Sequence, residues 1–213
     1  MVTVSTSAAP SRSYHHGDLR SALVEAGLKA LESTSLADLS LRQIARDVGV
    51  SATAVYRHFP DKAALLAALA AEGIAQMAQR QREAASCAAP DQAFAATGRA
   101  YVRWALAHPA LFRLVFGQCR EVGQTVFGDN DAARMLRDYA QGIAGDEAGA
   151  QRLMLQAWSL VHGLAMLMLE GQLPSDDALI DRVIDPRTLF PGSDGHSARP
   201  GAQDGVARET GPW

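Results

Sequence analysis

The stretch from Ala52 to Phe59 gathers hydrogen-bonding side chains with little bulk between them. Those side chains are Thr53, Tyr56, Arg57 and His58. Ala52 and Ala54 are small enough to allow close approach to a surface. Val55 and Phe59 are the clearly apolar residues, so we expect them to fix the inner face of a short helix. A helix with a pinned inner face and a small, polar outer face fits the major groove of DNA.

Charged residues flank this stretch at positions that suit nucleic-acid contacts. Lys62 falls in the first turn of the next predicted helix, where the helix dipole disfavours a cation but attracts a phosphate. Arginine grips guanine through two hydrogen bonds, so Arg57 and Thr53 are predicted to read base edges. Arg42 can contact either a base or a phosphate. Tyr56, His58 and Lys62 are predicted to bind phosphates, which position the protein without specifying sequence. The predicted interface is Arg42, Ser51, Ala52, Thr53, Ala54, Tyr56, Arg57, His58 and Lys62.

Two short helices and the start of a third are predicted to position these residues. Apolar residues in 41–48 recur three or four positions apart, which is typical of one helix face. Ser40 is the predicted side-chain cap of that helix. Gly49 is predicted to end the helix, because glycine adopts the left-handed backbone conformation at little energetic cost. Ser51 caps the second helix, which is predicted to run from Ala52 to Phe59. The third helix begins at Asp61.

The stretch IARDVGVSATAVYRHFPDKAALL resembles the helix-turn-helix of the TetR family of transcriptional regulators. The resemblance spans Leu19 to Leu69 and lies in the Gly-Val-Ser turn, the Tyr-x-His-Phe pattern and the lysine two residues after proline. It implies an all-α protein of about nine helices, with a three-helix DNA-binding domain and a helical domain for ligand binding and dimerisation. It also implies a homodimeric repressor of a palindromic operator, released by a small, largely apolar ligand.

Length and charge agree with such a protein. The chain has 213 residues, 48% of them hydrophobic, which is enough to bury a core as one domain or two small ones. The net charge of −3 argues against a general nucleic-acid coat but leaves a local site open. Residues 1–62 hold seven Lys/Arg against six Asp/Glu. Positive charge is therefore slightly concentrated in the N-terminal part of the chain.

Five segments are predicted along the chain. They are a disordered arm over 1–13, a DNA-binding domain over 14–60, a connecting helix over 61–89, a ligand-binding and dimerisation domain over 90–190, and a disordered tail over 191–213. The first helix is expected to start near Gly17 or Asp18. Arg12 in the arm is either a minor-groove contact or solvated. His15 and His16 lack partners at metal-ligand spacing, so a phosphate contact or a capping role is expected instead. The resemblance implies that the connecting helix transmits ligand binding by tilting.

Only helical periodicity occurs beyond the break at Ala89-Pro90. The predicted helices are Asp91–Ala107, Ala110–Arg120, Asp129–Ile143, Glu147–Gly171 and Ser175–Ile184, with a loop over Gly123–Gly128 and Ser175 as the last cap. The Glu147–Gly171 helix is apolar on nearly all sides, so it must be buried on more than one face. One face is expected to meet its own core and the other a second copy of the chain. The Ser175–Ile184 helix is expected to join it in a homodimer.

A W-x-x-x-H-G motif at Trp158, His162 and Gly163 resembles the motif of one TetR-like C-terminal subgroup, as does the YHHGDLR opening. Trp158 and His162 are four residues apart and are expected to stack. Gly163 in a helix interior costs about 1 kcal/mol relative to alanine, so a close approach is expected there. A pocket wall and an ordinary core remain alternative interpretations. The candidate walls are Tyr101, Trp104, Phe112, Phe116, Met154, Trp158, His162 and Met166.

Other classes of protein are less consistent with the residues. No Gly-rich phosphate loop, nucleophile elbow, His-Glu-x-x-His pair or Cys/His cluster occurs, so no enzyme, metal site or cofactor is predicted. Cys87 and Cys119 are expected to be reduced thiols, with a redox switch between them left open. No run of eighteen apolar residues and no secretory signal occurs, so we expect a cytoplasmic protein without membrane contact. A helical protein-interaction adaptor that does not bind DNA is the alternative function.

Overall fold

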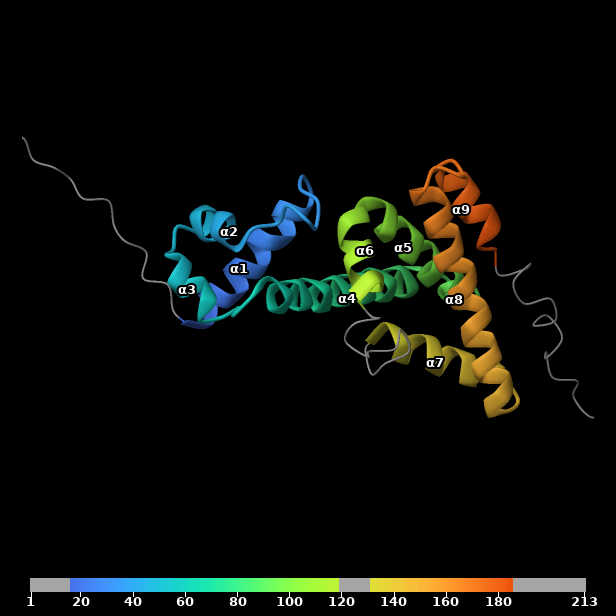
Figure 1. Ribbon diagram of the computed structural model, residues 1–213. Coiled ribbons are helices and arrows are strands. Elements are labelled where there is room, and N and C mark those ends of the chain that lie inside the picture. Colours follow the sequence, from blue (N-terminus) through green and yellow to red (C-terminus); the bar gives the residue numbers. More distant parts are fainter. Residues whose placement is uncertain (1–15, 119–130, 186–213) are drawn as a thin grey trace, which may run out of the picture.

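The computed structural model describes residues 16–118 and 131–185, and both segments are helical without strands, as the all-α prediction requires (Figure 1). The helices are α1 (His16–Leu31), α2 (Leu41–Val48), α3 (Ala52–Tyr56), α4 (Lys62–Cys87), α5 (Ala93–Ala107), α6 (Pro109–Gln118), α7 (Asp131–Ile143), α8 (Glu147–Leu169) and α9 (Asp177–Val183). Several predicted features lie outside the described residues, namely the N-terminal arm with Arg12, His15, Cys119, the loop Gly123–Gly128 and the tail 191–213.

Helix α4 is the element that both ends of the molecule share. α1, α2 and α3 gather at one end, and α4 runs from them into the group formed by α5, α6, α8 and α9 (Figure 1). Its 26 residues agree with the predicted long helix. One cluster of buried apolar residues extends from Leu19 on α1 to Ile184 after α9. A displacement of α4 therefore alters packing in both regions.

The crossing of α4 and α6 depends on a glycine. A Cβ atom at Gly73 would lie 3.0 Å from side-chain atoms of Leu111 and Val115. That separation is tighter than ordinary van der Waals contact, so the two helices approach one another as closely as they do because position 73 has no side chain. α6 begins at Pro109, the position of a helix where a missing N–H costs nothing. The predicted start at Ala110 was therefore one residue late.

Three further predictions about helix ends and caps were wrong. Ser40 precedes α2 in extended backbone, but its side chain makes no capping hydrogen bond. α3 ends at Tyr56 rather than Phe59, and the chain continues as a turn in which the Phe59 amide still donates to the Val55 carbonyl at 2.9 Å. Asp176, not Ser175, caps α9 by accepting from the Ala178 amide at 3.1 Å.

Helix α8 is less buried in the single chain than its apolar sequence suggested. Its buried residues are Ala150, Leu164, Ala165 and Met168. Leu155 and Leu167 are 46% and 39% exposed. By length and composition α8 also meets the criterion for a membrane-spanning helix, a test that a core helix of a soluble protein passes as well. Only 22% of its apolar window is buried within the single chain.

Candidate nucleic-acid interface and aromatic cluster

Helix α3 is fixed at its start by the turn that precedes it. Gly49 adopts φ +78°, the left-handed conformation predicted for the end of α2. The Ser51 hydroxyl then accepts a hydrogen bond from the Ala54 amide at 3.2 Å, as predicted for the cap of α3. Five residues form too short a helix to be stable alone, because nucleation is costly. Its position therefore depends on this cap and on packing.

The inner face of α3 and of the turn after it is fixed by the two residues that the sequence identified. Val55 and Phe59 are each 1% exposed and belong to the continuous core. The guanidinium of Arg20 on α1 lies over the Phe59 ring, 5.2 Å from its centroid. Sequence reasoning missed this cation–π contact, because nothing in the local pattern links positions 20 and 59. The contact joins α1 to the turn after α3 and adds to the rigidity of that turn.

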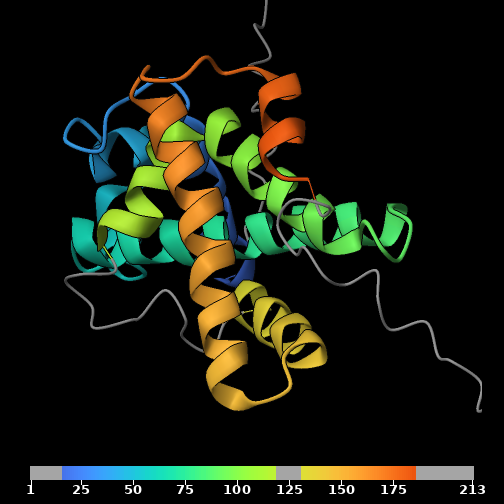
Figure 2. The same ribbon diagram turned by 90° about the vertical axis from the view of Figure 1, so that its right-hand side faces the viewer.

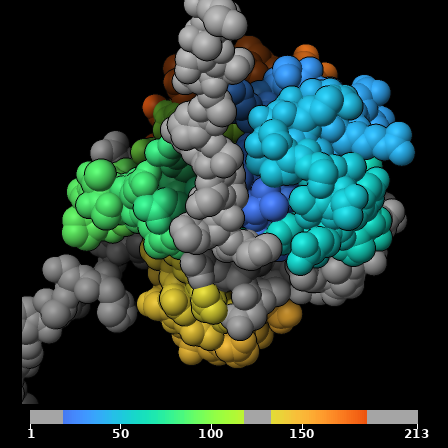
Figure 3. Space-filling view, turned by 90° about the vertical axis from the view of Figure 1, so that its left-hand side faces the viewer, coloured from blue at the N-terminus to red at the C-terminus, as the bar shows by residue number. Residues whose placement is uncertain are grey.

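The outer face of α3 presents the predicted polar residues to solvent. Thr53, Tyr56 and Arg57 are exposed, with Tyr56 45% accessible, and His58 is half-buried. The remaining predicted contacts are also at the surface, with Ser51, Ala52 and Arg42 exposed and Ala54 half-buried. α2 and the α3 segment lie beside one another on the end of the molecule that Figure 3 shows. The predicted residues on α2, on α3 and in the turn after α3 are therefore exposed or half-buried.

Lys62 has an additional contact within the chain. Its ammonium group donates to the carbonyl oxygen of Ala37 at 2.7 Å. The side chain therefore joins the start of α4 to the loop between α1 and α2, 25 residues earlier. Asp61 caps α4, accepting from the Ala64 amide at 2.7 Å. At this helix start, Lys62 has both a structural partner and the position predicted for a phosphate contact.

An aromatic cluster lies in the C-terminal region, on α5, α6 and α8. Its members are Tyr101, Trp104, Phe112, Phe116, Trp158 and His162. The Trp158 and His162 rings stack at 4.8 Å with an interplanar angle of 21°, as their spacing predicted. Phe112 and Phe116 lie 5.4 Å and 4.9 Å from the His162 ring, between centroids. Three helices therefore converge on one imidazole.

The six cluster residues and the two methionines differ in burial. Tyr101, Trp104 and Phe112 are buried, as expected of core residues. Phe116, Trp158 and His162 are half-buried, as are the predicted wall residues Met154 and Met166. The indole N–H of Trp104 is buried and has no hydrogen-bond partner among the described residues. A buried donor without an acceptor is costly, so a water or ligand acceptor would be stabilised there.

One hydrogen bond crosses the aromatic cluster. The Tyr101 hydroxyl and His162 Nδ1 lie 3.0 Å apart, on α5 and α8 respectively. Burial raises the pKa of Tyr101, although a hydrogen bond with Trp158 opposes this effect. Burial also lowers the pKa of His162 below its usual 6.5. At neutral pH the hydroxyl is therefore protonated and the ring uncharged, and the cluster is polar but neutral.

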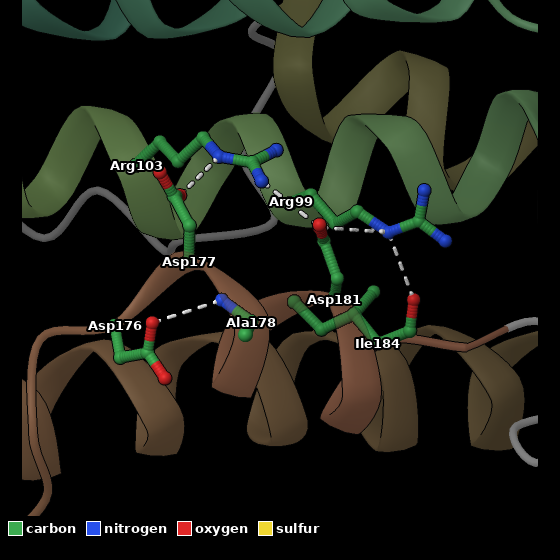
Figure 4. Close-up of polar contacts among 7 residues, drawn as sticks. All are labelled: Arg99, Arg103, Asp176, Asp177, Ala178, Asp181 and Ile184. Carbon is green, nitrogen blue, oxygen red and sulfur yellow. Dashed lines mark hydrogen bonds and ion pairs between the residues drawn. The ribbon is translucent and has the colours of Figure 1, made fainter.

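A set of ion pairs attaches α9 to α5 (Figure 4). Arg103 donates to Asp177 at 2.7 Å and to Asp181 at 2.9 Å. Arg99 donates to the Ile184 carbonyl at 3.1 Å, and its Nε lies 3.6 Å from Asp181. These contacts place the Arg103 side chain on α9. An anionic ligand at Arg103 would have to compete with these two carboxylates.

Among the described residues, no group of three or more His, Cys, Asp or Glu side chains is placed to hold a metal ion. Cys87 is exposed at the end of α4.

Two family models match the chain in the order of its two regions. The model of bacterial regulatory proteins of the tetR family matches residues 23–69. The model of the tetracyclin repressor-like C-terminal domain matches residues 94–186. The first contains α2, α3 and the start of α4, and the second contains the aromatic cluster.

Relatives with known sequences or structures agree with these matches. An HTH-type transcriptional regulator of Mycobacterium tuberculosis is 33% identical over 98 residues, 45% of this chain and 42% of that protein. The chain thus matches less than half the length of this curated relative. A solved protein of unknown function from Rhodococcus sp. RHA1 is 33% identical, with a TM-score of 0.69, and the match covers 85% of this chain and 98% of that one.

A more distant structure shows the same fold. A tetR-family transcriptional regulator from Streptomyces coelicolor has a TM-score of 0.58 at 22% identity, over 80% of this chain and 79% of that one. A helix-turn-helix followed by a helical C-terminal domain defines a class of bacterial regulatory proteins. The chain belongs to the TetR family of transcriptional regulators, a family of regulators and not of enzymes.

Proposed function

We propose that this protein is a cytoplasmic, homodimeric repressor that binds a palindromic operator and releases it when a small, largely apolar ligand binds. The observation that carries the proposal is the construction of α3. In α3 and the turn that follows it, Val55 and Phe59 are buried, whereas Thr53, Tyr56 and Arg57 face solvent. Such a helix can enter a major groove without losing its attachment to the core.

The proposed roles of the interface residues follow their chemistry. Arg57 and Thr53 read base edges, and Arg42 contacts either a base or a phosphate. Tyr56, His58 and Lys62 contact phosphates. To reach a phosphate, the Lys62 ammonium group exchanges or shares its bond with the Ala37 carbonyl. The small residues Ser51, Ala52 and Ala54 permit close approach of α3 to the groove.

The proposed ligand site is the half-buried side of the aromatic cluster. Phe116, Met154, Trp158, His162 and Met166 form the accessible walls, and Tyr101, Trp104 and Phe112 lie behind them. The neutral Tyr101–His162 pair favours an uncharged ligand that carries a hydrogen-bonding group. The assignment to the W-x-x-x-H-G subgroup belongs to this proposal and rests on Trp158, His162 and Gly163.

The proposed signal passes through α4. The wall residue Phe116 is on α6, and α6 crosses α4 at Gly73. Because α4 also packs on α1 in the continuous core, a shift of α6 changes the position of α3 in each subunit of a dimer. Two recognition helices then no longer fit successive grooves of the operator.

Fluorescence anisotropy tests the proposed function. Labelled DNA from upstream of the protein's own gene is titrated with purified protein in excess unlabelled random duplex. We expect binding that survives the competitor and is reversed by an uncharged apolar compound found by screening in the same assay. Binding no tighter than the nonspecific range of about 10⁻⁴–10⁻⁶ M contradicts an operator in that DNA. Tighter binding on addition of a compound would show a corepressor instead.

A further inference from the structure

One cation at the recognition end of the molecule lies outside the predicted set of DNA contacts. It is Arg20, an exposed residue near the start of α1. In Figure 3 the start of α1, in blue, is visible on the same end of the molecule as the α2 and α3 segments. Figure 2 views the molecule from the opposite end, where α8 and α9 lie in front of these helices. The start of α1 therefore shares a surface with the recognition segment.

The aromatic ring of Phe59 holds the Arg20 side chain in place. The guanidinium carbon lies 5.2 Å from the centroid of that ring, which is within the range of a cation–π interaction. The ring is 1% exposed and belongs to the continuous core, so its own position is fixed. The guanidinium is thus positioned over the turn that follows α3, where His58, the residue before Phe59, is a predicted phosphate contact.

Within the described part of the chain, the charge of Arg20 has no partner carboxylate. The ion pairs found there involve other arginines. Asp61, two residues after Phe59, instead accepts a hydrogen bond from the Ala64 amide at the start of α4. Arg103 in the C-terminal region shows the contrast, because two carboxylates bind its guanidinium. A positioned arginine without such partners is suited to a ligand that carries negative charge.

The chemistry of this position favours a DNA phosphate over a base edge. A guanidinium presents its N–H donors in a planar fork that matches two oxygens of one phosphate. The cation–π contact with the ring uses none of these N–H donors. In a helix-turn-helix protein the recognition helix enters the major groove, and the elements beside it meet the sugar-phosphate strands that border the groove. α1 is such a neighbouring element.

We propose that Arg20 is a phosphate contact of this DNA-binding domain, supplied by α1 and positioned by Phe59. The proposal rests on the DNA binding of the proposed function and adds a contact to the predicted set. With His58 in the turn and Lys62 at the start of α4, three separate segments then contact the DNA backbone around α3. Such a contact positions α3 in the groove without adding sequence preference. Because the ring already restricts the side chain, little rotamer freedom is lost on binding.

The salt dependence of binding to a labelled random-sequence duplex tests Arg20. Each phosphate contact contributes about 0.9 to the slope of log K against log salt on B-DNA. Arg20→Gln removes the charge, so we expect the slope to fall by about 1 for each bound subunit and binding to weaken up to about fivefold at low salt. Arg113→Gln is the matched control, since it removes the same charge from an exposed position on α6, in the C-terminal region. We expect it to leave the slope unchanged.

Arg20→Lys separates a phosphate contact from a purely structural role. The lysine restores the positive charge, so we expect it to restore the wild-type salt slope. Thermal unfolding of both variants measures the loss of the contact with Phe59, and a change in stability alone does not alter the salt slope. An unchanged slope in Arg20→Gln, or a reduced slope that Arg20→Lys does not restore, would overturn the assignment. A wild-type protein that binds neither the random duplex nor the upstream DNA at low salt would instead overturn the proposed function.

Discussion

The two ends of the molecule leave large side chains exposed for different reasons. In the described segments, the large hydrophobic residues that are exposed are Tyr56 on α3 and Ile143, Leu155 and Leu167 on α7 and α8. Tyr56 carries a hydroxyl and lies among polar neighbours, as a groove-contacting residue does. The other three are purely aliphatic, as residues covered by another chain are. The exposed Tyr56 suits contact with DNA, and the three exposed aliphatic residues suit contact with a second copy of the chain.

Removing the core contact of α3 should have the largest effect on the N-terminal end. Phe59→Ala is expected to lower the free energy of unfolding by about 3–5 kcal/mol, because it empties a fully buried site beneath the recognition segment. The exposed Tyr56→Ala should stay within about 0.5 kcal/mol. Urea denaturation measures both. A comparable loss of unfolding free energy in the two variants would contradict the assignment of a buried inner face and an exposed outer face.

A change on the outer face should act on DNA alone. Arg57→Ala is expected to weaken operator binding by about 1–3 kcal/mol and to relax the preference at one base pair, because a bidentate contact is lost. Arg46→Ala is the control, since Arg46 hydrogen-bonds to Gln43 on α2 and is outside the predicted interface. Binding to a set of single-base operator variants measures the effect. A uniform loss across that set would make Arg57 a phosphate contact.

Lys62 should behave as a phosphate contact without sequence preference. Lys62→Ala is expected to weaken binding to all sequences alike and to reduce the salt slope by about 1. Lys29→Ala on α1, the one other lysine in the sequence, is the control. Lys62 also donates a hydrogen bond to the Ala37 carbonyl. Thermal unfolding of the same variants measures the loss of that hydrogen bond separately from the loss of the DNA contact. An unchanged salt slope with altered base preference would contradict the assignment.

The smallest effect is expected from the aromatic cluster. Burial lowers the pKa of folded His162, so below its usual pKa of 6.5 the unfolded chain takes up a proton that the folded ring resists. Stability is therefore expected to fall as the pH drops from about 6.5 toward the lowered pKa. His162→Gln should remove that part of the pH dependence. Thermal unfolding between pH 5 and 8 measures it, and identical profiles for both proteins would contradict a buried neutral ring.

Local signals predicted the recognition segment well because its structure is local. Gly49 adopts the expected left-handed backbone, and Ser51 caps α3 through an amide three residues away. The residue before a proline is disfavoured in α-helical backbone, which excludes Phe59 from α3, and the helix ends three residues earlier at Tyr56. Ser40 failed because an extended cap position does not by itself bring the hydroxyl to an amide.

Long-range contacts could not be predicted from spacing. Tyr101 and His162 meet across 61 positions, and Arg103 reaches Asp177 across 74. At the start of α9, Ser175, Asp176 and Asp177 are all able to cap a helix, so local preference could not select among them. Asp176 caps, and Asp177 pairs with Arg103. The aromatic residues were likewise visible as apolar positions, but their convergence on His162 depends on three packed helices.

Selection from a pool of random duplexes tests the central claim most directly, since it requires both ends of the molecule to act together. The account predicts an enriched inverted repeat, with each half-site read by one α3 and the spacing set by a two-fold dimer. It also predicts that Arg57→Ala relaxes one position in each half-site. Enrichment of no sequence would contradict DNA as the partner, and a single unrepeated site would contradict the dimer.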